Sequence, residues 1–131
     1  MADAEVPSAV VEAARRLVAS NKYAYDTGHN RGADWLTDDK MDCSEFVRTA
    51  LRQAGIATSL QRSSDFASYY PPVTEPQAGD LVYWKTPGHI AIVEDPKAGT
   101  FLGAQNSGLA QANYKVGWWA TIGPHTFHRP K

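Results

Sequence analysis

The sequence predicts an α+β fold in which N-terminal helices pack on an antiparallel β-sheet. Two stretches of the first half, 6–20 and 43–55, place apolar residues at the three- and four-residue spacing of an amphipathic helix. From Gly79 onward the pattern changes to short apolar runs bounded by turn residues, which is typical of strands. We expect these strands to form an antiparallel meander.

The composition is that of one globular domain, which we expect to span residues 1–131 and to be monomeric. A net charge of −1 argues against nucleic-acid binding and against a polybasic membrane anchor. No apolar run is long enough to span a membrane, so no membrane insertion is expected. The single cysteine excludes an internal disulfide, and the acidic first residues do not resemble a signal peptide.

The first predicted helix, 6–20, is a packing element. Its apolar stripe includes Val10, Ala14 and Leu17, and Pro7 is tolerated in the first turn. The loop that follows, 21–40, is rich in Asp, Gly, Asn and Thr and carries several aromatic residues. Loops of this length in a small domain are often functional, although aromatic side chains in a loop more often cover the edge of a core.

The second predicted helix begins at the only cysteine. Asp42 is a suitable N-cap, Glu45 completes a capping box, and Gly55 ends the helix. Cys43 therefore lies in the first helical turn, where unpaired N–H groups and the helix dipole favour a thiolate. A buried structural cysteine is the alternative interpretation, because free cysteines are among the most buried residues.

Shorter elements follow in the second half of the chain. Ser64 and Asp65 are suited to cap a short helix that runs to Tyr70 and ends before two prolines. The predicted strands are 80–84, 89–94 and 100–105, with further strands expected at 117–122 and 126–129.

Cysteine catalysis needs a base for the thiol proton and a group that orients the base. His89 is the candidate base, because it opens a strand after Gly88 and shares a face with the small Ala91. Gln105 on the neighbouring strand is the candidate orienting group, and the adjacent Asn106 is an alternative. A single histidine on a strand is otherwise most often an ordinary surface or core residue.

A metal site is the competing interpretation of the histidines. His29, His125 and His128 together with Cys43 match no Cys/His zinc spacing. We therefore expect neither a metal nor an organic cofactor.

These residues lie in motifs that resemble those of the NlpC-type cell-wall peptidases, which are permuted papain-like cysteine hydrolases. The motifs follow the family's order and cover about residues 5–128: Tyr23-Ala24-Tyr25, Asp42-Cys43-Ser44-Glu45-Phe46-Val47, Gln61-Arg62-Ser63-Ser64, Pro76 with Gly79-Asp80-Leu81-Val82-Tyr83-Trp84, and Gly88-His89-Ile90-Ala91-Ile92-Val93. The resemblance implies a papain-like fold with the nucleophile at the start of a helix.

The resemblance also implies the catalytic roles. Cys43 is the nucleophile, His89 the general base, and Tyr23 helps to hold the oxyanion. The third catalytic position, often a second histidine in the family, falls near Gly103, which cannot do that work. The segment 101–108 instead resembles a variant of the fold found in secreted antibacterial toxins, in which Gln105 takes that place. The sequence departs from the family again where Glu45 replaces a glycine.

The implied substrates are the stem peptides of peptidoglycan, which the family cleaves at amide bonds, commonly between D-glutamate and a diamino acid. The residues expected to bind substrate are Asp42, Ser44, Arg62, Ser63 and Trp84. The aromatic side chains at 70, 84, 118 and 119 are candidates to line the substrate groove, and packing on the sheet explains each of them at least as well.

The expected setting is outside the cytoplasm, where the substrate lies. We expect a toxin that a type VI secretion system delivers to the periplasm of a target cell, with an immunity protein as its inhibitor. The alternatives are a phage or wall-remodelling hydrolase, a permuted papain-like acyltransferase or phospholipase that acts on lipids, and a catalytically inactive binding module.

Overall fold

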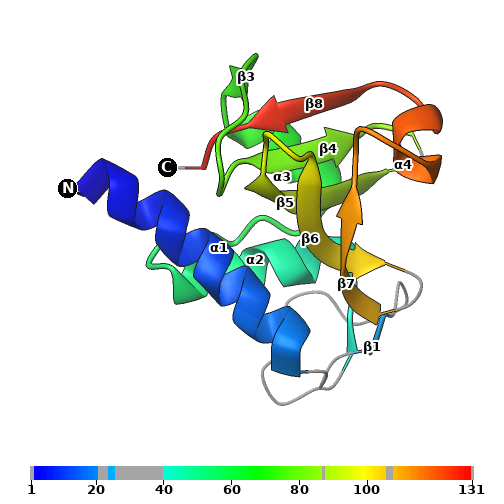
Figure 1. Cartoon of the computed structure of the whole chain (residues 1–131). Coiled ribbons are helices and arrows are strands. Elements are labelled where there is room, and N and C mark those ends of the chain that lie inside the picture. Colours follow the sequence, from blue (N-terminus) through cyan, green and yellow to red (C-terminus); the bar gives the residue numbers. More distant parts are fainter. Residues whose placement is uncertain (1, 21–23, 26–39, 87, 106–107, 131) are drawn as a thin grey trace.

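The computed structural model describes residues 2–20, 24–25, 40–86, 88–105 and 108–130 (Figure 1). The helices are α1 (Ala2–Ser20), α2 (Cys43–Gln53), α3 (Ser63–Tyr69) and α4 (Trp118–Thr121). The strands are β1 (Ala24–Tyr25), β2 (Lys40–Met41), β3 (Pro72–Val73), β4 (Leu81–Trp84), β5 (His89–Asp95), β6 (Thr100–Gln105), β7 (Gly108–Asn113) and β8 (His125–His128). Within these described ranges, no helix has the length and apolar character to cross a membrane.

The main sheet has the strand order β3-β8-β4-β5-β6-β7, and every neighbouring pair is antiparallel. Strands β4 to β7 form the meander, whereas β8 returns from the end of the chain and inserts between β3 and β4. A separate parallel pair joins β1 to β2. The predicted α+β class, with N-terminal helices on an antiparallel sheet, is confirmed.

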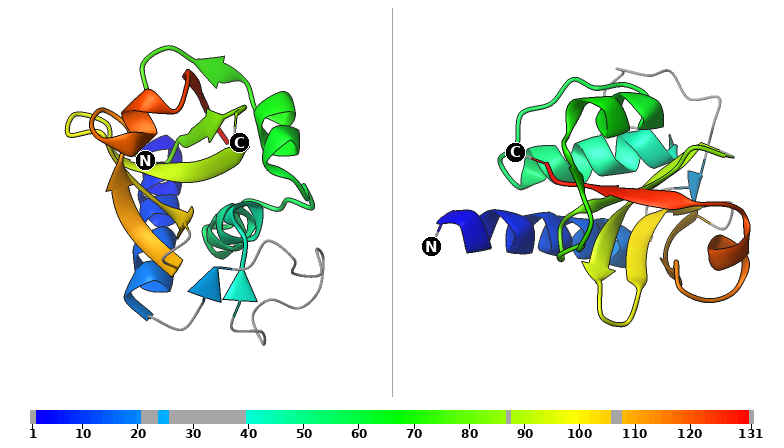
Figure 2. Two further views of the ribbon diagram at one scale, coloured as in Figure 1. Left: turned by 90° about the vertical axis from the view of Figure 1, so that its right-hand side faces the viewer. Right: turned by 90° about the horizontal axis from the view of Figure 1, so that it is seen from above.

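The two faces of the sheet support two apolar cores, because successive strand residues point to opposite faces. On one face, α1 and α2 pack against a cluster that includes Ile90, Ile92 and Leu102. On the other face, Ala91 and Val93 belong to a second cluster. Figure 2 shows α1 and α2 lying beside each other against the first face, which we call the helix face. The second face is called the aromatic face, and its cluster contains Val82, Trp84, Ala91, Val93, Phe101 and Tyr114.

Two predicted elements differ in the structure. The stretch 117–122 is not a strand, because it forms the short helix α4, closed by a hydrogen bond from the N–H of Ile122 to the carbonyl of Trp118. Helix α3 begins at Ser63, before the predicted cap at Ser64 and Asp65, and its N-cap is Arg62. The Arg62 N–H donates to the Asp65 carboxylate at 3.0 Å, so Asp65 caps the helix from its third position.

Candidate active site

The start of α2 is built as the sequence predicts. The Glu45 N–H donates to the Asp42 carboxylate at 2.8 Å, and the Asp42 N–H donates to the Glu45 carboxylate at 3.3 Å, which completes the capping box. Cys43 is therefore the first helical residue and is half-buried beside the helix-face cluster. The first turn of a helix carries the positive end of the helix dipole, so this position favours negative charge.

His89 is the first residue of β5, and its side chain lies on the aromatic face. Its ring centroid lies 4.7 Å from that of Trp119, 5.8 Å from Trp84 and 6.5 Å from Phe101. The residue is only 5% exposed. Burial lowers the pKa of His89 to about 4, and the interaction with Gln105 opposes this shift. The imidazole is therefore neutral at physiological pH, which is the state that a general base requires.

Gln105 meets His89 across the sheet. Ile92 pairs with Leu102, and continuing this register places His89 opposite Gln105. A Cβ atom at Gly103 would lie 2.5 Å from the Oε1 atom of Gln105 and 3.0 Å from the Cβ atom of Ala91. The amide therefore occupies the space that the glycine leaves. Its Nε2 atom donates to the carbonyl of Ala110 at 3.2 Å, which fixes the side chain.

Cys43 and His89 lie on elements that pack against each other. Helix α2 contacts β5, and Figures 1 and 2 show both elements beginning at the same end of the molecule. The two side chains belong to different faces, however. Cys43 packs against the helix-face cluster, while the ring of His89 is held on the aromatic face. Catalytic hydrogen bonds in unliganded structures are often long and tighten when the substrate binds.

The structure changes the assignment of three residues that were expected to bind substrate. Asp42, Ser44 and Trp84 are 2%, 1% and 0% exposed, so none of them presents a surface to a ligand. Asp42 and Ser44 are committed to the helix cap, since the Ser44 hydroxyl donates to the Asp42 carboxylate at 2.9 Å. Trp84 packs in the aromatic cluster, and its indole N–H donates to the carbonyl of Trp119 at 3.1 Å.

The other predicted site residues either remain accessible to a ligand or lie outside the described part of the chain. Arg62 is exposed and Ser63 is partly exposed at the start of α3. Tyr23 and Asn106 lie outside the described residues. Trp119 was among the aromatic residues named from the sequence, but its contact with His89 was not predicted.

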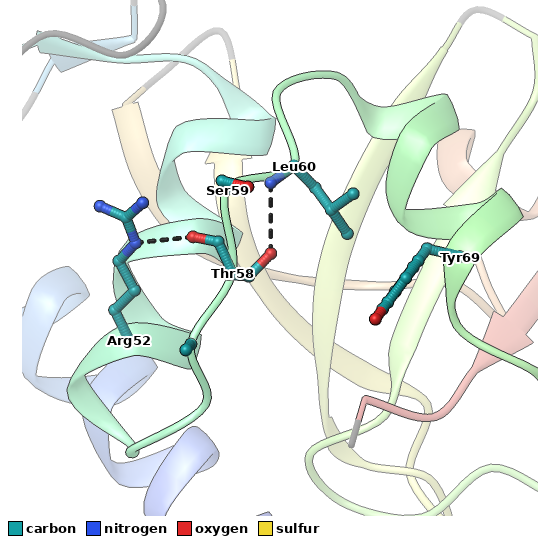
Figure 3. A pocket seen from close by; sticks show the side chains of 6 residues that line it. Arg52, Thr58, Ser59, Leu60 and Tyr69 are labelled. Carbon is teal, nitrogen blue, oxygen red and sulfur yellow. Dashed lines mark hydrogen bonds between the residues drawn. The ribbon is translucent and has the colours of Figure 1, made fainter.

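An open hollow of about 630 Å³ lies at the opposite end of α2 (Figure 3). The side chains of Leu60 and Tyr69 face each other across it, and the Arg52 Nε–H donates to the carbonyl of Thr58 at 2.8 Å. The lining residues are Arg52, Ala57, Thr58, Ser59, Leu60 and Tyr69. Arg52 is about 13 Å along the helix axis from Cys43 at the α-helical rise, so this hollow is separate from the start of α2. Among the residues described, no three or more His, Cys, Asp or Glu side chains gather as a metal site.

Comparison with known proteins identifies the family of this chain and structures that share its fold. The family model described as the NlpC/P60 family matches residues 20–123. No curated protein matches the chain significantly. Among solved structures, the P60 domain of antigen MAP1204 from M. avium subspecies paratuberculosis superposes with a TM-score of 0.64 at 16% identity. That alignment covers 94% of this chain and 96% of the other.

Two further structures share the fold. The peptidoglycan hydrolase RipB from Mycobacterium tuberculosis has a TM-score of 0.60 at 23% identity, and the alignment covers 94% of this chain and 65% of that one. NlpC1 from Trichomonas vaginalis has a TM-score of 0.65 at 15% identity, with coverage of 92% and 44%. This chain therefore spans less than half the length of NlpC1.

Proposed function

Because the chain belongs to the NlpC/P60 family, we propose that it hydrolyses amide bonds in peptidoglycan stem peptides with Cys43 as the nucleophile. Membership of this family supports a cell-wall hydrolase of the cysteine peptidase type. The fold is shared with RipB, which is named as a peptidoglycan hydrolase. The observation that carries the proposal is the single cysteine at the first position of α2, packed on the strand that begins with His89.

The proposed reaction uses groups already described. His89 accepts the proton of the Cys43 thiol, and the sulfur attacks the amide carbonyl to form a tetrahedral oxyanion. N–H groups in the first turn of α2 stabilise that charge. His89 then protonates the leaving amine, the C–N bond breaks, and an acyl-enzyme remains. Water, deprotonated by His89, releases the acyl group as a carboxylate, and the thiol is restored. Gln105 holds the imidazole in position throughout.

We propose the bond between D-glutamate and a diamino acid as the cleavage site, with Arg62 and Ser63 contacting the stem peptide. The resemblance of the 101–108 segment to toxin variants of the fold supports a further proposal. In it the protein acts as a monomeric toxin that a type VI system delivers to the periplasm of a target cell. An immunity protein that covers the start of α2 would protect the producing cell.

The test is digestion of purified peptidoglycan with wild-type protein and with Cys43→Ala, followed by mass spectrometry of the released fragments. We expect new amine and carboxyl ends with the wild type alone, and their masses identify the bond. His89→Ala should lose activity by about 100-fold or more, the usual contribution of a general base. Thermal unfolding of each variant verifies its fold.

Two results would contradict the proposal. Equal release by Cys43→Ala would remove the thiol from the mechanism. No release by folded wild-type protein, on several wall types, would redirect attention to lipid substrates or to a binding role.

A further inference from the structure

A short segment of the chain covers His89. Helix α4 places the Trp119 ring over the imidazole, with centroids 4.7 Å apart and planes inclined by 30°. The carbonyl of Trp119 accepts the hydrogen bond from the Trp84 indole, which anchors the segment to the sheet. Trp119 also contacts Phe101 edge-on, at 5.4 Å between centroids and 88° between planes. The segment therefore seals the aromatic face over the candidate base.

The seal leaves the imidazole in an unfavourable state. The Nε2 atom of His89 is buried and has no hydrogen-bond partner among the described residues. A buried polar atom without a partner is costly, and such atoms in native structures point to a functional explanation. A general base must also reach the thiol and the substrate, which the covered ring cannot do.

The segment is bounded by two glycines and has its own internal hydrogen bonds. Gly117 and Gly123 flank α4 with φ values of 70° and 147°, a backbone region that other residues rarely adopt. Between them, the N–H of Ile122 and the hydroxyl of Thr121 both donate to the carbonyl of Trp118, so the segment holds its own shape. Trp118 is 60% exposed, so half of the tryptophan pair does not contribute to a buried core.

We propose that residues 117–123 form a lid that is closed over His89 in this structure and must open before catalysis. Opening breaks the Trp84–Trp119 hydrogen bond and withdraws the Trp119 ring, while the two glycines take up the change in backbone direction. The imidazole is then exposed. The catalytic meaning of the lid rests on the proposed function, whereas the lid itself can be tested without activity.

The surroundings of the ring support a steric rather than an electrostatic seal. Trp84, Phe101 and Trp119 surround the imidazole and carry no charge, and Gln105 is neutral. Two further titratable rings contact these neighbours: His125 lies 5.6 Å from Trp84 and Tyr114 lies 6.5 Å from Phe101, between ring centroids. Exposure of His89 is therefore governed by the position of the aromatic side chains.

The test measures how fast diethyl pyrocarbonate acylates each histidine of the full chain at pH 7, mapped by mass spectrometry. The lid variants are Trp119→Ala, which removes the cover, and Gly117→Ala, which strains the closed backbone without touching His89. A Cβ atom at position 117 would have no atom within 4 Å, so its effect comes from the backbone alone. Gly55→Ala is the matched control, because Gly55 also has a positive φ, of 93°, and open space around it.

We expect slow acylation of His89 in the wild type and in Gly55→Ala. It should be about tenfold faster in Gly117→Ala, since a positive φ on alanine shifts the equilibrium toward other conformations by about that factor. Acylation of His89 should be faster still in Trp119→Ala, because that variant removes the covering ring. His128 is the internal standard for unfolding, because it is buried and both of its ring nitrogens are hydrogen-bonded.

An unchanged rate at His89 in both lid variants would overturn the lid. Acceleration of His89 and His128 by the same factor would overturn it too, because exposure would then come from general unfolding. Neither readout depends on hydrolysis. A protein with a lid but without activity refutes the proposed function alone, and an active protein with an unresponsive His89 refutes the lid alone.

Discussion

At the scale of the residue, His89 shows what a sequence motif can and cannot predict. The sequence could place Gln105 on the strand beside His89, because two strands joined by a short connection pair as neighbours. The burial of the ring was not predictable in the same way. It depends on Trp119, which reaches His89 from a segment outside the meander and has no periodic pattern to mark it.

The buried neutral imidazole makes stability depend on pH. The pKa of His89 falls from an ordinary 6.5 to about 4 in the folded state, because burial disfavours the charged ring. Between these values the unfolded chain binds more protons, so stability decreases as pH falls through this window. We expect about 2 kcal/mol to be lost between pH 7 and pH 4.5 through this group, measured by urea denaturation.

His89→Gln is the control for that measurement, because glutamine does not titrate while other groups continue to do so. The variant should lose less stability than the wild type over the same interval. Identical losses in the two proteins would mean that His89 is not buried in its neutral form.

At the scale of the element, the sequence predicts the capped start of a helix more reliably than it predicts whether a short segment is a helix or a strand. The cap of α2 could be predicted from Asp42 and Glu45 alone, since both partners lie within one turn. The helix α4 could not, because its two tryptophans fit a strand pattern equally well and four residues give too little periodicity. Strand β7 was also missed, because its sequence of small and polar residues alternates weakly.

The cap of α2 should contribute measurably to stability. Asp42→Ala removes the side-chain acceptor of two buried donors, the Glu45 N–H and the Ser44 hydroxyl. We expect a loss of about 1–2 kcal/mol in urea denaturation, at the upper end for an N-cap. Asp42→Asn keeps the acceptor oxygen and should lose less. Equal losses would show that the charge, rather than the cap geometry, stabilises the helix start.

At the scale of the whole molecule, the last described strand holds the sheet together. β8 pairs with β3 on one side and with β4 on the other, and these pairings join residues far apart in sequence. Sequence patterns predicted a strand near 126–129 but could not choose its neighbours, because long-range pairing leaves no local signal. Arg129 then clamps the end of β8 to the start of β4 through two hydrogen bonds to Asp80, at 3.0 and 2.9 Å.

Breaking this clamp should destabilise the whole sheet. The Asp80 side chain is only 4% exposed, so Arg129→Ala leaves a buried carboxylate without its cation. We expect a loss of about 1–3 kcal/mol, since Arg129 itself is partly exposed to solvent. Arg129→Lys should lose less stability than Arg129→Ala, because lysine keeps the charge but not the paired hydrogen bonds. Arg15→Ala is the comparison, since the Arg15 partner of Glu94 is 57% exposed and should contribute less than about 1 kcal/mol.

The insertion of β8 between β3 and β4 also sets an order of events during synthesis. A ribosome makes residues 72–84 long before residues 125–128, so β3 and β4 emerge without the strand that joins them. Until β8 arrives, the facing edges of both strands expose unpaired backbone groups that can recruit another nascent chain. The same insertion delays the clamp between Arg129 and Asp80. The main sheet of this domain is therefore complete only after residues 125–128 have been translated.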